Sequence, residues 1–334
     1  MTTRRACAHK LLEASLLVAV LNCNPYVLEP IPNAIEFRPR LSDYGLFQGS
    51  MSALQPRDNV FAYELNTELF TDYANKQRLL RLPEGTAMIA VGDGLPSFPD
   101  GTMLAKSFFY PRDVRRPSLG RRIIETRLLI KHDGRWNAAT YLWNSSQDDA
   151  QLGTDGRTVF VEWTTGAGVR RSVRYEVPSN DNCSNCHRSN GQIVPIGPQL
   201  RNLNDNWSDH SANQTSGQLL RLAQRGLLTA GELRTVKALP PWDDVTLPIA
   251  DRARAYMDVN CAHCHRPSGW ASQTGLRLEF ERPFVDTRIS SRRDRMVQRI
   301  TATRRDERMP RIGTTIHHDE GVALLLQYLE SLRR

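Results

Sequence analysis

The sequence predicts an α+β multidomain fold, in which an N-terminal β-sandwich-like domain is followed by mainly α-helical modules. Two patterns predict it. Before Pro178, short runs of β-branched and aromatic residues are separated by turn residues, as in antiparallel sheets. After Pro178, apolar residues recur at the spacing of amphipathic helices. A chain of 334 residues is long enough for two or three hydrophobic cores.

Two hairpins are expected in the N-terminal domain, residues 35–178. Asp133-Gly134 is a turn signal between two apolar runs, and Gly166 and Gly168 separate two more. The expected extended runs are residues 79–91, 101–110, 125–131, 139–143, 158–163 and 169–177.

Four helices are expected after Pro178. Thr229 and Glu232 form a capping-box pattern that opens one of them, and Pro240 ends it. Leucines line one face of the last helix. The expected helices are residues 216–227, 229–239, 251–260 and 322–332.

The pattern Cys-x-x-Cys-His occurs twice, as Cys183-Ser184-Asn185-Cys186-His187 and as Cys261-Ala262-His263-Cys264-His265. It is the attachment signature of c-type haem, in which two thiols form thioethers and the histidine binds the iron. The sequence therefore predicts two covalent haems. The attachment residues are Cys183, Cys186, Cys261 and Cys264, and the proximal iron ligands are His187 and His265.

Two other kinds of cysteine site stay open. A zinc ribbon places its second cysteine pair about 15–20 residues after the first, whereas here the second pair begins only at Cys261. A thioredoxin-like dithiol expects one pair near a βαβ pattern. Neither site requires the histidine that follows each pair. The haem interpretation divides the C-terminal half into a first haem-c module, residues 179–247, and a second cytochrome c module, residues 248–334.

Methionine or histidine is the usual sixth ligand of an electron-transfer haem. For the second haem Met309 is the candidate, because it lies in Arg308-Met309-Pro310 just before the last helix; His317 and His318 are lesser rivals. For the first haem the choice stays open. The candidates are His210, Met257, a residue of the β-rich domain such as Met88 or Met103, and an open position.

Residues 1–23 have the pattern of an export signal. Arg4, Arg5 and Lys10 precede a short apolar run over residues 15–21. Export to the periplasm agrees with c-type haem, and processing as a membrane-anchored lipoprotein at Cys23 stays open. A buried or frayed N-terminal helix is the alternative. No other segment reaches 18 consecutive apolar residues.

The formal net charge of +8 does not indicate nucleic-acid binding, because the surplus is local: arginines outnumber acidic residues between Arg282 and Arg311. A basic face could steer an acidic periplasmic redox partner. A solvated helix face, with some of its arginines paired with haem propionates, is the favoured explanation of the same charge.

A family resemblance rests on the haem motifs and several other stretches. They are residues 44–47, 63–76, 125–128, 183–187, 195–198, 252–265 and 308–310. On these stretches the chain resembles a little-characterised family of bacterial diheme c-type cytochromes with a β-rich N-terminal domain. The resemblance covers about residues 40–334 and implies the same architecture here. Related sequences carry a Pro-Gly-x-Pro element before the last methionine, which this chain lacks.

Two functions follow from these patterns. The first is a periplasmic diheme cytochrome that carries electrons between redox partners. The second is a haem-dependent oxidoreductase, peroxidase-like or substrate-oxidising, with an open first haem and a substrate bound by the β-rich domain. Aromatic and acidic candidates for substrate binding there are Trp136, Trp143, Asp148 and Asp149. No catalytic motif accompanies them, so electron transfer is favoured. A zinc-stabilised module remains only if haem is absent.

Overall fold

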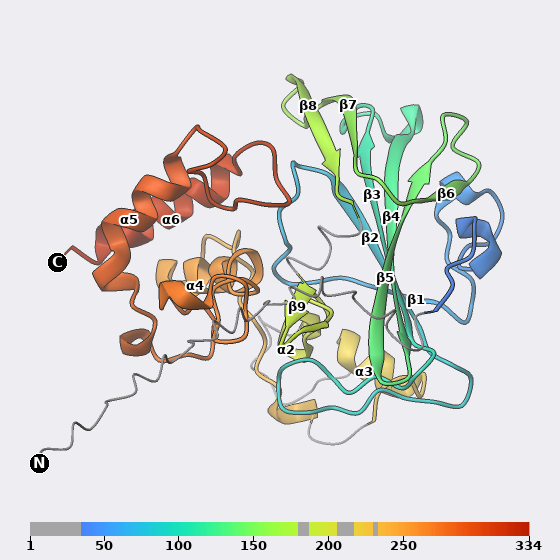
Figure 1. Ribbon diagram of the computed structural model, residues 1–334, viewed down its shortest axis with the longest axis horizontal. Helices are drawn as coiled ribbons and strands as arrows, with labels where there is room; N and C mark the ends of the chain where they lie inside the picture. Colours follow the sequence, from blue (N-terminus) through green and yellow to red (C-terminus); the bar gives the residue numbers. More distant parts are fainter. Residues whose placement is uncertain (1–34, 180–186, 206–216, 230–232, 334) are drawn as a thin grey trace, which may run out of the picture. The chain divides into compact units, whose positions relative to one another are not determined.

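The main element of the computed structural model is a six-stranded antiparallel sheet in which each strand pairs with the next along the chain (Figure 1). The structure describes residues 35–179, 187–205, 217–229 and 233–333. Residues 35–334 cluster as one compact unit. The strands of the sheet are β1 (Phe61–Tyr63), β2 (Asn75–Arg81), β3 (Met103–Pro111), β4 (Arg121–His132), β5 (Arg135–Trp143) and β6 (Ala150–Gly153).

The β4–β5 hairpin confirms the strongest local prediction. His132 pairs with Arg135, and the two residues between them have positive φ angles, 47° at Asp133 and 71° at Gly134. Such a turn matches the right-handed twist of the strands that it joins, which is why Asp-Gly predicts it. The turn therefore fixes the register of β4 against β5.

Alternation along the strands gives the sheet two buried faces. Leu79 and Met103 belong to one cluster and Leu80 and Leu104 to another, because successive side chains of a strand point to opposite faces. Two 3₁₀ helices, η1 (Leu41–Tyr44) and η2 (Met51–Ala53), lie along the chain segment that packs on the first face. The second face is covered by α2 (Leu200–Leu203) and α3 (Gln218–Gln224).

A second hairpin covers another part of the second face. Strands β7 (Arg157–Thr164) and β8 (Arg170–Val177) pair only with each other and form a separate two-stranded sheet within the described residues. Trp163 packs on Tyr110 of β3 with a ring-centroid separation of 5.0 Å, and Tyr175 packs on the same ring at 6.2 Å. The hairpin thus packs against the second face of the large sheet.

Three helices dominate the C-terminal part. They are α4 (Ile249–Asn260), α5 (Ile289–Thr301) and α6 (Asp319–Ser331). Met257, Met296 and Leu325 are among the residues that join them in one apolar cluster. In the part of the chain that the structure describes, each helix is too short or too polar to span a bilayer. The remaining short elements are η3 (Pro117–Leu119), β9 (Arg188–Ser189), β10 (Gln192–Ile193), η4 (Leu233–Thr235), η5 (Ser272–Thr274) and η6 (Phe284–Asp286).

The predicted fold class is wrong in two respects. Strands β7 and β8 are a hairpin and not the second sheet of a sandwich. The protein is β-rich rather than mainly helical after Pro178, because the described residues between 187 and 247 form only short helices, a small hairpin and irregular chain. The helix expected at residues 229–239 is reduced to the 3₁₀ turn η4 among its described residues. The boundaries proposed at residues 178 and 247 stay a prediction.

The segment that joins β1 to β2, residues 64–74, has no regular structure but many hydrogen bonds. The Asn202 side chain closes a pair of bonds with the backbone of Thr67, accepting from its N–H and donating to its carbonyl, each at 2.9 Å. The Asn66 side chain donates to the carbonyls of Asn204 and Leu239. This joining segment therefore ties α2 and the chain before α4 to the edge of the sheet.

Replacing Asn202 by alanine is expected to lower the free energy of unfolding by about 3 kcal/mol, because it leaves a buried N–H and a buried carbonyl of Thr67 without partners. Urea titration followed by circular dichroism measures the change. The control is Asn75→Ala on the exposed start of β2, which is expected to change the unfolding free energy by less than about 0.5 kcal/mol. Equal effects of the two substitutions would contradict the role given to Asn202.

Candidate functional site

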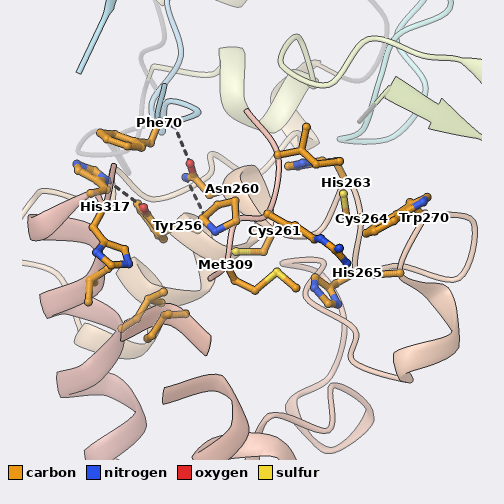
Figure 2. A pocket seen from close by; sticks show the side chains of 18 of the residues that line it. Phe70, Tyr256, Asn260, Cys261, His263, Cys264, His265, Trp270, Met309 and His317 are labelled. Carbon is orange, nitrogen blue, oxygen red and sulfur yellow. Dashed lines mark hydrogen bonds between the residues drawn. The ribbon is translucent and has the colours of Figure 1, made fainter. Parts of the chain in front are cut away.

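The second Cys-x-x-Cys-His motif lies at the end of α4, where the helix turns into a compact loop. The N–H groups of Cys261 and Ala262 both donate to the carbonyl of Met257, and those of Cys264 and His265 donate to the carbonyl of Cys261. These bonds close the loop on itself. Both thiols and the imidazole consequently line one pocket (Figure 2).

This C-terminal pocket is mostly apolar. Apolar walls come from four separate parts of the chain. They include Phe70, Trp270, Ile300, Ile312, Ile316 and Leu325.

His265 is held as a neutral ligand-type imidazole. Its Nδ1 lies 3.3 Å from Oγ1 of Thr274, whose own hydroxyl donates to the carbonyl of Ala271 at 2.8 Å. The hydroxyl proton is thus used, so Nδ1–H of His265 is the donor and Nε2 keeps its lone pair. Burial, with smaller contributions from His263 and the nearby arginines, lowers the pKa of His265 from 6.5 to about 4. The ring is therefore neutral at pH 7.

Met309 reaches the same pocket from the loop between α5 and α6 (Figure 2). Its N–H donates to the carbonyl of Arg299 at 2.9 Å. The buried guanidinium of Arg308 donates to the carbonyls of Thr314 and Thr315 at 2.8 and 2.7 Å. Arg308 therefore joins two parts of the loop that carries Met309 by hydrogen bonds.

Asp72 holds this loop from the sheet side. Its carboxylate accepts from the N–H and hydroxyl of Thr315 at 2.7 and 2.9 Å, and from the N–H of Ile316 at 3.2 Å. Burial raises the pKa of Asp72, and the bonds from Thr315 and Ile316 oppose that rise. The joining segment 64–74 therefore forms part of the pocket wall as well as the link to α2.

An aromatic cluster closes one side of the pocket. Phe70 stacks on His318 with a centroid distance of 4.2 Å, and Nδ1 of His318 lies 2.9 Å from the hydroxyl of Tyr256. Trp242 packs edge-on against His318 at 4.9 Å. The N–H of Phe70 donates to the side chain of Asn260, the residue before the motif. These contacts keep the wall rigid and exclude water from that side.

The thiol of Cys261 suits covalent attachment better than metal binding as a thiolate. Cys261 and Cys264 are not joined in a disulfide. Burial, with a smaller contribution from Asp258, raises the pKa of Cys261 from 9.0 to about 12. A zinc ligand or a redox-active dithiol needs a thiolate that is accessible near neutral pH. The environment of Cys261 does not favour one.

The first motif is only partly within the described residues. Cys183 and Cys186 lie outside them, as does His210, one of the candidates for the sixth ligand of the first haem. His187 lies in a separate pocket on the second face of the sheet, and its Nδ1 donates to the carbonyl of Val194 at 2.8 Å. Burial and the nearby Lys106 lower the pKa of His187 to about 3.

The other candidate ligands have structural roles. Met257 is fully buried in the C-terminal cluster, and Met88 and Met103 are buried in the two clusters of the sheet. None of these three is among the residues that line the pocket of His187. His317 and His318 line the C-terminal pocket instead of a surface loop, and Nε2 of His317 lies 3.0 Å from the carbonyl of Ala302.

The prediction of two covalent haems is corrected by the structure. Within the described residues, no three His, Cys, Asp or Glu side chains lie close enough to hold a metal ion together. Of the two cysteine pairs, only Cys261 and Cys264 belong to this part of the chain. In the part of the chain that the structure describes, the two sequence motifs are therefore not matched by two equivalent metal sites. The prediction was wrong because a short motif determines the local turn but not the residues that pack around it.

The polar groups suggested for substrate binding are structural. Trp143 donates to the hydroxyl of Thr126, and Trp136 packs on Phe98 at 5.2 Å. Asp149 accepts from the N–H and hydroxyl of Ser42. These contacts occupy the groups that sequence reasoning had left available for a substrate.

Sequence reasoning missed Asp72, Phe70 and Thr274. Asp72 has a positive φ of 48°, which an aspartate adopts more readily than most residues, but its partners lie at residues 315 and 316. No local pattern reveals such a distant contact. For Thr274 the only signal is its position in a short turn after His265.

Comparison with known proteins gives no relative. No protein-family model matches the chain, and neither the curated proteins nor the solved structures yield a match. The geometry of the pocket and the chemistry of its side chains therefore carry the functional argument.

Acidification is expected to destabilise the protein through His318. Burial lowers the pKa of His318 from 6.5 to about 4 in the fold, so the unfolded chain binds a proton first as the pH falls. The free energy of unfolding should then decrease between pH 6.5 and about 4. His318→Phe keeps the stacking on Phe70 but cannot bind the proton.

Urea titrations at pH 7 and pH 5 measure this effect. The expected result is a smaller loss of stability between the two pH values for His318→Phe than for the parent chain. His132→Phe is the control, because His132 is exposed at the β4–β5 turn. An identical pH dependence in the parent chain and His318→Phe would contradict the account.

Proposed function

We propose that the protein is a periplasmic electron-transfer protein of the c-type cytochrome class, with one redox centre in the C-terminal pocket. One observation carries the proposal. Cys261, Cys264, His265 and Met309 come from two distant parts of the chain and line the same apolar pocket. Two thiols for attachment, an imidazole and a thioether form the donor set of such a centre.

The pocket residues fit an iron porphyrin attached at this one motif. Nε2 of His265 and the sulfur of Met309 would hold the iron, and the thiols of Cys261 and Cys264 would attach the porphyrin. When bound, the porphyrin iron would supply reversible one-electron chemistry. An imidazole and a thioether together would favour electron transfer over ligand chemistry.

The chain's own residues orient the donors and control access of water. Thr274 fixes the ring of His265, while Arg308 and Asp72 fix the loop of Met309. Phe70 and its aromatic neighbours close one side. Trp270 is 48% exposed and lines the pocket, so this side offers the shortest route to a partner.

The partner and the location belong to the same proposal. Arginines of α5 such as Arg292 and Arg295 are exposed and give this region a positive field that would attract an acidic redox protein. Others are already paired within the chain, as Arg305 is with Glu176. The export pattern of residues 1–23 and the tether at Cys23 lie outside the described residues, and they support a periplasmic site from sequence only.

The test is to produce the full chain together with haem-attachment machinery in the bacterial periplasm. The parent chain is expected to retain haem after denaturation, and the Cys261→Ala/Cys264→Ala variant should lose the haem of the C-terminal pocket. Met309→Ala should retain covalent haem but lose the methionine–iron absorption band. The reduction potential of this variant should fall by an amount that cyclic voltammetry can detect, because a thioether ligand raises the potential.

Met296→Ala is the matched control, because Met296 is a core methionine of α5. It should lower stability without removing the absorption band. A Cys261→Ala/Cys264→Ala variant with the same covalent haem content as the parent chain would refute the assignment of this pocket.

A further inference from the structure

Three cationic side chains form a row across the middle of the sheet. Arg78 of β2 pairs in register with Lys106 of β3, and Lys106 pairs with Arg127 of β4. Directly opposed residues on antiparallel strands have Cβ atoms about 4.5–5.5 Å apart, and like charges at this spacing repel. The row lies on the second face, beside the pocket that contains His187.

The two outer cations have carboxylate partners. Arg78 lies 3.0 Å from a carboxylate oxygen of Glu68 and 3.7 Å from one of Glu64. Arg127 lies 2.6 Å from a carboxylate oxygen of Glu125, which also accepts from the buried hydroxyl of Tyr175. The charge at each end of the row is thereby compensated.

Lys106 in the centre is not compensated in this way. Within the described residues, no hydrogen bond or ion pair reaches its ammonium group, and the nearest recorded contact is the ring of Phe108 at 5.2 Å. Burial, reinforced by Arg127 and Arg78, lowers the pKa of Lys106 from 10.5 to about 7. Burying the charged form of this lysine costs free energy of folding unless an anion binds beside it.

Lys106 is the one cation of the row that has no carboxylate partner among the described residues. A single carboxylate on a ligand would therefore be enough to pair the row.

The rest of the pocket is apolar. Leu104 and Leu129 of the sheet form its floor, and Leu65, Ile196 and Pro198 form its walls. The lining thus offers an apolar cavity with a short cationic row along one side.

We propose that this sheet-face pocket binds an organic monocarboxylate with an apolar body, whose carboxylate is held by Lys106 while its apolar part lies against Leu104 and Leu129. The site is separate from the C-terminal pocket, with which it shares no lining residue among those described. Occupancy would neutralise the row and remove the cost of burying Lys106.

The test measures binding of laurate to the full chain by isothermal titration calorimetry, with dodecanol as the uncharged ligand of the same length. The parent chain is expected to bind laurate more tightly than dodecanol. Lys106→Met removes the charge and keeps the length of the side chain. It should weaken laurate binding by about tenfold, the effect of losing one charge-assisted hydrogen bond, and should not weaken dodecanol binding.

Two further variants complete the design. Lys237→Met removes an exposed lysine elsewhere and should bind laurate like the parent chain. Cys261→Ala/Cys264→Ala should also bind laurate normally, so failure of the electron-transfer proposal would leave this result unchanged. If Lys106→Met proves insoluble, Lys106→Gln serves in its place, with the same expected weakening.

Three outcomes would overturn the proposal. One is equal affinity of the parent chain for laurate and dodecanol. Another is unchanged laurate binding in the Lys106 variant. The third is loss of laurate binding in the cysteine variant alone, which would place the ligand in the C-terminal pocket.

Discussion

The hydrogen bonds of the joining segment, residues 64–74, are the constraint on which the rest of the structure depends. This stretch is irregular, so its backbone groups need partners outside a sheet or helix. Asn202 supplies them for Thr67, Asn260 supplies one for Phe70, and the Asp72 carboxylate in turn holds Thr315. A single short segment therefore bonds to three regions that are far apart in sequence.

The walls of the C-terminal pocket are therefore formed largely by residues outside the Cys-x-x-Cys-His motif. Cys261 and His265 follow α4, but Phe70 reaches the pocket from the edge of the sheet. The loop with Met309 is fixed by Arg308 within the loop and by Asp72 across from it. A pocket built in this way keeps its two donors in place without relying on the ligand alone, which is the preorganisation that a redox centre requires.

Local patterns predicted local structure well. The β4–β5 hairpin follows from Asp133-Gly134, and α4 and α6 follow from apolar periodicity. The sandwich prediction failed because alternation shows that a strand has a buried face but not what covers it; here helices and a hairpin do so. The capping-box pattern at Thr229 failed because a cap initiates a helix but does not sustain one against the packing of the following chain.

The candidate site was predicted in part. The sequence identified Cys261, Cys264, His265 and Met309, and the structure brings all four to one pocket. It could not identify Asp72, whose partners lie more than two hundred residues away, at Thr315 and Ile316. Nor did it identify the row through Lys106, because the register of three strands is needed to align the charges. Long-range register and long-range hydrogen bonds are the information that a motif does not contain.

Hydrogen exchange of the Asp72→Gly variant, read by mass spectrometry, tests the organising role of the joining segment most directly. Glycine adopts the positive φ of 48° at this position without strain, so the substitution removes the carboxylate without straining the backbone. The account predicts faster exchange at residues 314–318, with exchange in β4 and β5 unchanged. Unchanged exchange at residues 314–318 would contradict it.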